Sequence, residues 1–539
     1  MVATTAMSLV VFGCSTVLAQ RPLDWGDQGN GTYKNPVLCA DYSDPDVVRV
    51  GQRYYMVASD FHFMGMQVLE SEDLVNWHIV SQVYRRFDYP GWNDNAHYGG
   101  GSWAPAIRYH NGQFYVYFCT PDEGLFMSTA TDARGPWSPL HCVKAVKKWE
   151  DPCPFWDDDG QAYLGRSQYG AGPIIIHKMS ADGRQLLDDG VTVYTGPVAE
   201  GTKILKRHGY YYLVIPEGGV CCGWQTVLRS RNIYGPYEKR IVLEQGSTAV
   251  NGPHQGALVD FLIPTSDALH QSTDTTWWFL HFQETHPAGR VVHMQPARWQ
   301  NDWPLIGVDI DGNGIGEPVA VWTTPNASIS GYSPKTAGSN ARSIGCFIYG
   351  NQSPLSWEEV GHGVWQWNHN PVDSAWSLTE RSGWLTFHVL PATDMKHSRN
   401  MLTQKTVGFE SRAVTRLDCS RLKDGDHAGL LCTGKAFMGV GVCREGGRLF
   451  FYLENDGQRR IISPCQKKTV FLRVDIDSRR NTHQLYYSID GRRFSTAGEP
   501  YSLRMGYWKG SRIGLFSYNT ETNVGGQAQF NDFHYEVLK

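Results

Sequence analysis

The stretch Arg53-Tyr-Tyr-Met-Val-Ala58 is short, aromatic and β-branched, and polar or turn-forming residues bound it. Three further runs share this composition, and they are Gln113-Phe-Tyr-Val-Tyr-Phe118, Tyr210-Tyr-Tyr-Leu-Val-Ile215 and Thr276-Trp-Trp-Phe-Leu-His281. Each run has the length of a β-strand, and no amphipathic helical period persists between the runs. The sequence therefore predicts an all-β protein.

A weak internal repeat surrounds these strands. Asp73-Leu-Val-Asn-Trp77 closes one unit, Gly135-Pro-Trp137 a second and Gly235-Pro-Tyr237 a later one. The units recur at roughly 50 to 60 residues, which is the span of a four-stranded propeller blade with its loops. We therefore predict a five-bladed β-propeller over residues 20–330. A β-sandwich built from similar hairpins is the alternative interpretation.

The sequence changes character after the propeller region. Ser330–Ser339 is rich in Ser, Gly, Pro and Ala, which predicts a linker. Strand patterns resume at Gly383–Val389, Arg448–Leu453 and Thr482–Ser488, separated by polar turns. This spacing is typical of a jelly-roll β-sandwich, so we expect a second β domain over residues 344–539.

Size and charge limit the class of protein. A chain of 539 residues is long for one hydrophobic core, so two or three domains are expected. A formal net charge of -4 and a pI near 6.5 argue against a nucleic-acid partner. The 19 Trp and 27 Tyr suit stacking on sugar rings, although all-β folds also use many aromatic residues. The sequence leaves the oligomeric state open.

Residues 1–19 have the pattern of an export signal. Met7–Cys14 is apolar, and Val17 and Ala19 fit the small-residue rule for signal-peptide cleavage, although no Lys or Arg precedes them. Val11-Phe-Gly-Cys14 is a poor lipoprotein box, so we prefer cleavage after Ala19. No later apolar run is long enough to span a bilayer. We expect a secreted or periplasmic protein without a membrane span.

Two local motifs carry little chemistry of their own. The vicinal pair Cys221-Cys222 is interpreted as two ordinary thiols, because the 12 cysteines lack the spacing of a metal finger or a disulfide-rich module. Asp309–Gly314 is similar to a calcium loop but lacks the bidentate Glu that completes an EF-hand. We interpret it as a solvated turn.

Three acidic residues occupy unusual positions. Asp44 and Asp151 each precede a proline where a strand begins, and Glu200 lies between apolar residues and Gly201. A single Asp-Pro is often only a turn-capping carboxylate. In a propeller, however, the innermost strands of different blades begin near the central axis, so these acids are expected to converge. Carboxyl groups that share a pocket are what general acid–base hydrolysis requires.

Ordered motifs along the chain resemble those of glycoside hydrolase family 43, the inverting β-xylosidases and α-L-arabinofuranosidases. The matching segments of the first domain are Asn35–Leu38, Asp44–Val47, Ser102–Pro105, Asp151–Phe155, Asp157–Gly160, Glu200–Gly201, Asn251–Gly256, Gly289–Arg290 and Trp303–Pro304. In the second domain, Val364–Pro371 and Ala375–Arg381 resemble the β-xylosidase C-terminal sandwich of concanavalin-like architecture. The resemblance covers essentially the whole mature chain.

The resemblance implies roles for eight residues. Asp44 is the expected general base, Glu200 the general acid and Asp151 the pKa modulator that also holds the acid in position. Arg290 is expected to bind sugar hydroxyls, and His254 to lie beside the sugar or a metal ion at the axis. The expected aromatic pocket walls are Trp103, Phe61 and, from the second domain, Trp508. For His254, Trp103 and Phe61, an ordinary core position is the alternative.

The function implied by the resemblance is an exo-acting, inverting glycoside hydrolase. It would release xylose from xylo-oligosaccharides or arabinoxylan without a required cofactor, although calcium binding is possible. An α-L-arabinofuranosidase on the same scaffold is one alternative, because the two sugars present similar hydroxyl patterns to a pocket. A non-catalytic carbohydrate-binding protein is the alternative of a different class.

Overall fold

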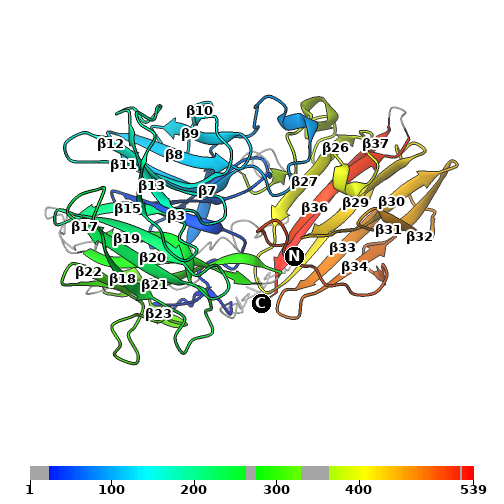
Figure 1. Cartoon of the computed structure of the whole chain (residues 1–539). Coiled ribbons are helices and arrows are strands. Elements are labelled where there is room, and N and C mark those ends of the chain that lie inside the picture. The colour runs from blue at the N-terminus through cyan, green and yellow to red at the C-terminus, as the bar shows by residue number, and fades with distance from the viewer. Residues whose placement is uncertain (1–22, 263–274, 286, 329–362, 522–524, 539) are drawn as a thin grey trace, which may run out of the picture.

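The protein consists of two β domains that lie side by side (Figure 1). The computed structural model describes residues 23–262, 275–285, 287–328, 363–521 and 525–538. The proposed export signal and the proposed linker at Ser330–Ser339 lie outside these residues. The helices found in the described ranges are short 3-10 turns, namely η1 (Trp92–Asp94), η2 (Pro325–Ser328), η3 (Asp373–Ala375) and η4 (Met395–His397). None of the described helices is long and apolar enough to cross a membrane.

The first domain is built from four-stranded antiparallel sheets that follow one another along the chain. The first three sheets contain β3 (Ser43–Val50), β4 (Arg53–Ser59), β5 (Gln67–Ser71) and β6 (Trp77–Gln82); β7 (Trp103–His110), β8 (Gln113–Thr120), β9 (Gly124–Ala130) and β10 (His141–Lys144); and β11 (Trp149–Trp156), β12 (Ala162–Gln168), β13 (Ile174–Met179) and β14 (Val191–Tyr194). The next two contain β15 (Lys203–Arg207), β16 (Tyr210–Glu217), β17 (Trp224–Ser230) and β18 (Glu238–Leu243); and β19 (His254–Leu262), β20 (Thr275–Thr285), β21 (Gly289–Gln300) and β22 (Trp303–Ile306).

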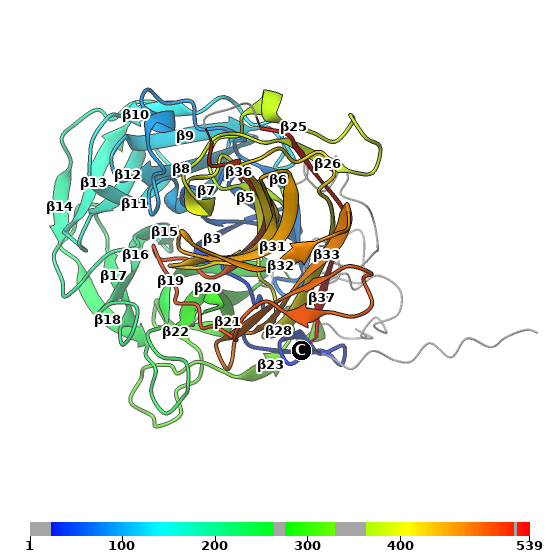
Figure 2. The same cartoon turned by 90° about the vertical axis from the view of Figure 1, so that its right-hand side faces the viewer.

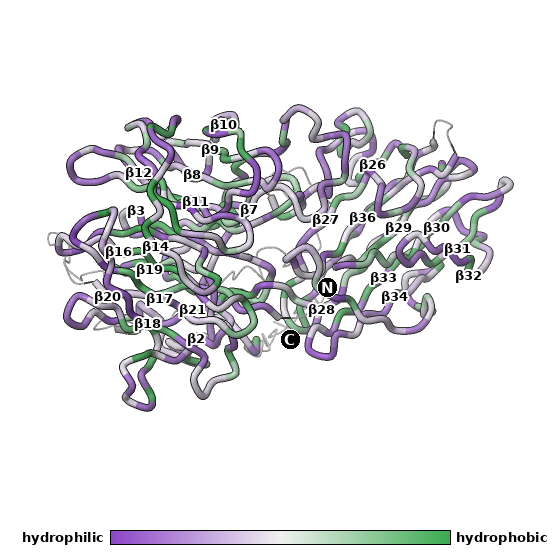
Figure 3. The backbone as a smooth tube through the Cα atoms, viewed as in Figure 1, coloured by the Kyte–Doolittle hydropathy of each residue, from purple (hydrophilic) through white to green (hydrophobic). Residues whose placement is uncertain are grey.

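These sheets form a propeller-type ring. The first strands β3, β7, β11 and β15 contact one another in succession, β16 packs against β19, and β19 packs against β3. A three-stranded sheet of β1 (Gly26–Asp27), β2 (Thr32–Lys34) and β23 (Val321–Thr323) pairs the beginning of the domain with its end. Hydrophobic stretches follow the strands, whereas many of the outer loops are hydrophilic (Figure 3).

The second domain is a sandwich of two seven-stranded sheets. In spatial order, one sheet contains β24 (Gln366–Trp367), β27 (Asn400–Lys405), β36 (Arg512–Asn519), β29 (Asp426–Thr433), β30 (Phe437–Glu445), β31 (Arg448–Asn455) and β32 (Gln458–Cys465). The other contains β25 (Trp376–Ser377), β26 (Leu385–His388), β37 (Gln527–Val537), β28 (Glu410–Asp418), β33 (Thr469–Asp477), β34 (Thr482–Ser488) and β35 (Ser495–Thr496). Burial alternates residue by residue along β28 and β33, as expected for strands with one face in the core.

The two domains share a core, and the sandwich lies across one side of the propeller (Figure 2). Lys405 Nζ of the sandwich lies 2.8 Å from Asp60 Oδ1 of the propeller and also donates to the Asp41 carbonyl oxygen at 2.8 Å. Ala40 pairs with Val407 in an isolated bridge between the domains. Because the ammonium group of Lys405 is buried, its ion pair with Asp60 positions one domain against the other.

Candidate active site

The first strand of each propeller sheet begins with the same irregularity. Between Ser43 and Asp46, β3 has one residue more than the part of β4 with which it pairs, which is a β-bulge. The strands β7, β11 and β19 carry one extra residue at the corresponding places. Before β15, Glu200 N donates to the Pro216 carbonyl oxygen at 3.3 Å while Lys203 pairs with Val214, which is the same one-residue excess. Such bulges redirect side chains and are common beside active sites.

The second residue of every bulge has a positive φ angle. The five residues are Asp44 (56°), Ala104 (39°), Asp151 (56°), Gly201 (64°) and Gln255 (27°). For a residue other than glycine this conformation costs on the order of 1–3 kcal/mol and persists only where the surroundings impose it. The first residues of the bulges are Ser43, Trp103, Glu150, Glu200 and His254. Asp44 and Asp151 therefore share one position, while Glu200 occupies the position before it.

Asp44 lies among hydrogen-bond donors. Its Oδ2 accepts hydrogen bonds from Ser43 Oγ at 2.7 Å and from Ser59 Oγ at 2.6 Å. Arg290 Nη1 lies 3.3 Å from Asp44 Oδ1 and donates to Ser43 Oγ at 2.9 Å. Ser59 Oγ in turn accepts from Ala104 N at 2.7 Å, which ties this carboxylate to the neighbouring bulge. Two hydroxyls and a guanidinium thus surround the Asp44 carboxyl group.

Asp151 is buried at the corresponding position of the third sheet. Its Oδ2 accepts hydrogen bonds from Ser167 Oγ and from Gly201 N, the latter at 2.8 Å, and its Oδ1 accepts from Gln255 Nε2 at 3.1 Å. Burial and the neighbouring Glu200 carboxylate raise the pKa of Asp151 to about 6. Asp151 therefore connects the third, fourth and fifth sheets beside Glu200.

Glu200 is the most accessible of the three predicted acids. Its side chain is 22% exposed, against 8% for Asp44, so a substrate oxygen has access to it. Glu200 Oε1 lies 2.8 Å from His254 Nε2, and the role of each atom depends on the imidazole tautomer. The His254 ring also lies 5.2 Å from that of Phe282. His254 therefore contacts the Glu200 carboxyl directly.

Arg290 reaches Asp44 from the fifth sheet. Besides its contacts with Ser43 and Asp44, its Nε donates to Glu284 Oε2 at 3.2 Å. Its guanidinium lies 4.6 Å from the centre of the Phe282 ring, and its backbone N–H donates to Asp41 Oδ1. These contacts hold the planar guanidinium fork beside Asp44, where it can donate to hydroxyl or carboxylate oxygens.

The predicted aromatic residues lie at the edge of the ring that faces the sandwich. Trp103 Nε1 donates to the Gly99 carbonyl oxygen, and the Trp103 ring centroid is 5.1 Å from that of Trp508, in an edge-to-face arrangement. On its other side, Trp103 lies 5.7 Å from the exposed ring of Tyr169. Phe61 is buried, and its backbone pairs with Ser102, next to Trp103. The second domain thus places one indole, that of Trp508, beside the propeller bulges.

Glu150 is a fourth acid that sequence reasoning did not single out. It precedes Asp151 and occupies the position in the third sheet that Glu200 occupies in the fourth. Carboxylate oxygens of Glu150, Asp151 and Glu200 all lie within 4.8 Å of one another. Burial, followed by the charges of Asp151 and Glu200, raises the pKa of Glu150 to about 9. The sequence signal that could have identified Glu150 is its position next to Asp151, as the first of two consecutive acids.

Two side-chain clusters in the described residues have donor sets suited to a metal ion. One is this same carboxyl cluster. The other, in the sandwich, contains His427, Cys443 and Glu445. There Arg459 Nη1 lies 3.2 Å from His427 Nε2, so the positive guanidinium already occupies the place beside this nitrogen. The loop at Asp309 closes on itself, since Asp309 Oδ1 accepts from Gly312 N, as expected for a turn.

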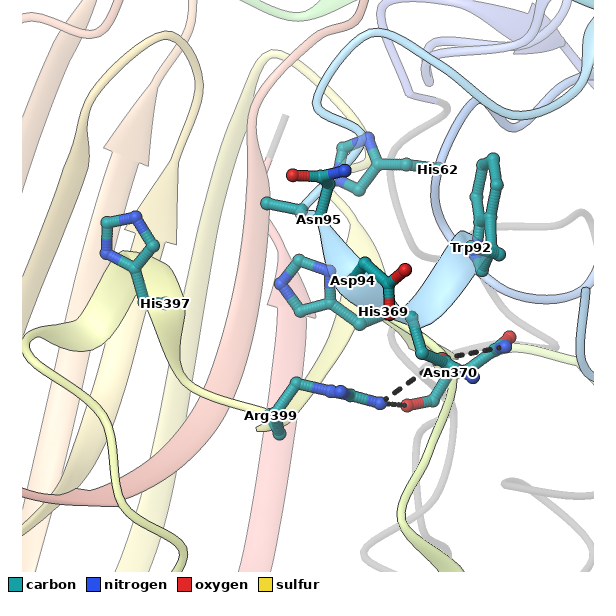
Figure 4. A pocket seen from close by; sticks show the side chains of 10 residues that line it. His62, Trp92, Asp94, Asn95, His369, Asn370, His397 and Arg399 are labelled. Atoms are coloured by element: carbon teal, nitrogen blue, oxygen red, sulfur yellow. Dashed lines mark hydrogen bonds between the residues drawn. The ribbon is translucent and has the colours of Figure 1, made fainter. Parts of the chain in front are cut away.

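A pocket of about 170 Å³ lies between the domains, apart from the acids (Figure 4). Its lining includes His62, Trp92 and Asp94 of the propeller and His369 and Arg399 of the sandwich. Arg399 Nη2 donates to the Asn370 carbonyl oxygen at 2.9 Å. The vicinal cysteines, elsewhere in the propeller, are exposed free thiols whose sulfurs are 2.8 Å apart.

Comparisons with known proteins agree with this architecture. The family model for glycosyl hydrolases family 43 matches residues 33–304, and the model for the beta xylosidase C-terminal Concanavalin A-like domain matches residues 361–536. A putative β-xylosidase of Xylanibacter ruminicola is 59% identical over 493 residues, covering 92% of this chain and 88% of that protein. A β-xylosidase of Formosa agariphila is 34% identical over 567 aligned positions, covering 93% and 90%.

A solved structure extends the likeness to three dimensions. A family 43 hydrolase whose active site was engineered to display both endo-xylanase and exo-arabinofuranosidase activity aligns with a TM-score of 0.78 and 26% identity. The alignment covers 95% of this chain and 100% of that one. Together with the family models and the relative at 59% identity, this shows that the chain belongs to glycoside hydrolase family 43 and carries the family's concanavalin-like C-terminal domain.

Proposed function

We propose that this hydrolase is an exo-acting, inverting β-xylosidase in which Asp44 is the general base and Glu200 the general acid. The observation that carries the proposal is the contrast between their surroundings. Asp44 accepts hydrogen bonds from hydroxyls and lies against Arg290, whereas Glu200 lies within a carboxyl cluster. Hydrogen-bond donors and a cation suit a carboxylate that accepts a proton from water, whereas a group that donates a proton is suited by neighbouring carboxyls.

The reaction follows from these roles. Asp44 takes a proton from water as the water oxygen forms a bond to the anomeric carbon. The bond from that carbon to the glycosidic oxygen breaks on the opposite face, and Glu200 gives its proton to the departing oxygen. Asp151 contributes negative charge beside the acid and holds its position through Gly201 N. Side-chain carboxyls suffice for these steps, so we expect activity to survive metal chelation.

The relatives named β-xylosidase support xylosides as substrates. The engineered family 43 structure with exo-arabinofuranosidase activity is the reason to measure an arabinofuranoside beside them. Exo action is supported by Trp508, which stands against Trp103 and restricts one side of the site. An obstruction of this kind favours a chain end over the middle of a polysaccharide. The apolar segment Met7–Cys14 supports export of the enzyme.

The decisive experiment compares kcat/KM for nitrophenyl β-xyloside and nitrophenyl α-L-arabinofuranoside. We expect the xyloside to be preferred. Binding of xylobiose without hydrolysis of either substrate would contradict an enzyme and favour a carbohydrate-binding protein. Proton NMR of the first product then tests stereochemistry, because an inverting enzyme releases α-xylose from a β-xyloside before mutarotation. Early β-xylose would mean a covalent intermediate and would remove Asp44 from the role of base.

A further inference from the structure

Glu150 is the acid in the cluster to which the three-carboxylate mechanism gives no task. It is the counterpart of Glu200 in the adjacent sheet, since each is the first residue of its bulge. In a regular strand, consecutive side chains point to opposite faces, so only one of Glu150 and Asp151 would face the site. The bulge, with its positive φ at Asp151, breaks that alternation, and both carboxyls reach the cluster.

The charges around Glu150 are nearly all of one sign. Asp151 on its own strand, Glu200 before β15 and Asp44 on β3 all act on it as negative neighbours. The one hydrogen bond described for its side chain comes from Ala171 N to Oε1 at 3.3 Å. His254 contacts Glu200 and has no described contact with Glu150. Three carboxylates this close and largely buried cannot all stay ionised, so the cluster retains a proton.

We propose that Glu150 is a positioning residue that carries a proton for the acid half of the site and returns it to Glu200 after each turnover. This inference rests on the proposed function, because it gives Glu200 the part of the acid. The oxygens of the two carboxyls lie within 4.8 Å, a gap that one water molecule spans. In the transfer, the O–H bond of Glu150 breaks, the water passes a proton on, and a new O–H bond forms on Glu200. Glu150, 8% exposed, then takes a proton from solvent.

The test uses the full-length protein and the variants Glu150→Gln and Glu150→Asp. Gln keeps an oxygen that accepts from Ala171 N but has no ionisable proton. With xylobiose, the alkaline limb of the kcat/KM profile should move to lower pH by about one unit, which is a tenfold loss above the limb. Dinitrophenyl β-xyloside, whose leaving group needs little protonation, should keep its rate. Glu150→Asp, which restores a carboxyl, should return the limb toward the wild-type position.

Glu454→Gln is the matched control. Glu454 is a buried glutamate of the sandwich, it accepts hydrogen bonds from Tyr518 Oη and Met395 N, and it lies outside the acid cluster. Its replacement should leave both limbs of the pH profile in place. If Glu150→Gln lowered kcat/KM equally for xylobiose and the dinitrophenyl substrate and left the alkaline limb unmoved, Glu150 would have only a structural role. That outcome would overturn the proposal.

A second measurement does not depend on activity. A carboxyl whose pKa is higher in the folded than in the unfolded protein lowers stability as pH rises between the two values, here about 4.5 and about 9. The melting temperature of Glu150→Gln, minus that of the wild type, should therefore increase as pH rises from 5 to 9. If this difference in melting temperature did not change with pH, Glu150 would be ionised in the folded protein and the inference would be refuted, whatever the substrate.

Two further outcomes separate this inference from competing explanations. An inactive wild type in the nitrophenyl assay counts against the proposed function, whereas the melting curves still decide the state of Glu150. Dialysis against EDTA distinguishes a proton from a bound cation in the same cluster. If chelation moves the alkaline limb of the wild type and Ca²⁺ restores it, a metal ion neutralises these carboxyls and the proton-carrying role of Glu150 is wrong.

Discussion

The proposed base half and the proposed acid half of the site are built from the same backbone geometry and differ in their neighbours. Asp44 and Asp151 occupy the same bulge position, with the same φ of 56°, and each accepts a hydrogen bond from a serine of the second strand, Ser59 or Ser167. Around Asp44 the next charged group is Arg290. Around Asp151 the next charged groups are carboxyls, and its pKa is raised.

This difference shows how a repeated fold produces two electrostatic environments. The ring supplies equivalent strained positions, and the charged residues placed beside each position set its surroundings. The fifth sheet gives Arg290 to Asp44, whereas the third and fourth sheets give glutamates to Asp151. One half of the ring of bulges therefore places a guanidinium against a carboxyl, and the other half gathers carboxyls and raises the pKa of Glu150 and of Asp151.

The largest expected effect comes from removing one carboxyl from each half. Glu200→Gln should lower kcat/KM for xylobiose roughly 100- to 10,000-fold, while an activated dinitrophenyl xyloside is largely spared because its leaving group needs no acid. Asp44→Asn should lower kcat/KM for both substrates by a similar factor, because water must be activated in either case. Parallel steady-state kinetics with the two substrates check this pair.

A reversed pattern would exchange the assignments. If Asp44→Asn spares the activated substrate and Glu200→Gln does not, the acid and the base are the wrong way round. Restoration of Asp44→Asn by azide as an external nucleophile, with formation of a glycosyl azide, would independently place Asp44 on the side of the water.

Much of the fold was predictable because local composition reports strands directly. The aromatic runs at Arg53–Ala58, Gln113–Phe118, Tyr210–Ile215 and Thr276–His281 are the second strands of their sheets. The turn motifs Asp73–Trp77, Gly135–Trp137 and Gly235–Tyr237 all lead from a third strand toward a fourth. The equivalent second strand of the third sheet, β12, contains Gly165 and Arg166 instead, which weakened the visible repeat.

The acid cluster was only partly predictable. The Asp-Pro pattern marks Asp44 and Asp151 because proline follows the strained residue, but it does not mark Glu200, which stands one position earlier in its bulge. Glu150 was missed because strict strand alternation places neighbours on opposite faces. The contact between Trp103 and Trp508 joins residues from different domains, and no local pattern encodes such a contact. Only the family resemblance pointed to it.

A medium effect is expected in the acid half for Asp151→Asn. Removing a negative neighbour makes the cluster give up its proton at lower pH, so the alkaline limb of kcat/KM should shift to lower pH, with about a tenfold loss above the limb. The pH profile with xylobiose measures this shift. An unmoved limb would leave Asp151 with a purely structural role and would break the contrast between the halves.

The fold of this variant needs its own check. All three groups that bond Asp151 are donors, so an Asn side chain turns its NH₂ toward at least one of them. Scanning calorimetry of Asp151→Asn beside Ser167→Ala separates the two effects. Ser167→Ala removes one of these donors but keeps the negative charge, so it should cost stability without moving the limb to lower pH.

The smallest effect should come from outside both halves, at Trp508. This residue is the sandwich's contribution to the aromatic edge, and its ring meets that of Trp103 edge to face at 5.1 Å. Aromatic pairs of this kind are worth about 0.5–1.5 kcal/mol beyond the area they bury. Because this pair holds the Trp103 ring in place, loss of the same energy from the bound state would raise KM for xylobiose roughly two- to tenfold in Trp508→Ala. Because Trp508 lies 41% exposed and is not part of the carboxyl cluster, kcat and both limbs of the pH profile should stay close to wild type. Trp508→Phe keeps a ring at this position and should recover most of the affinity. A shifted pH limb in Trp508→Ala would instead mean that the sandwich sets the protonation of the site, and the separation of the two halves would then depend on both domains rather than on the ring of bulges alone.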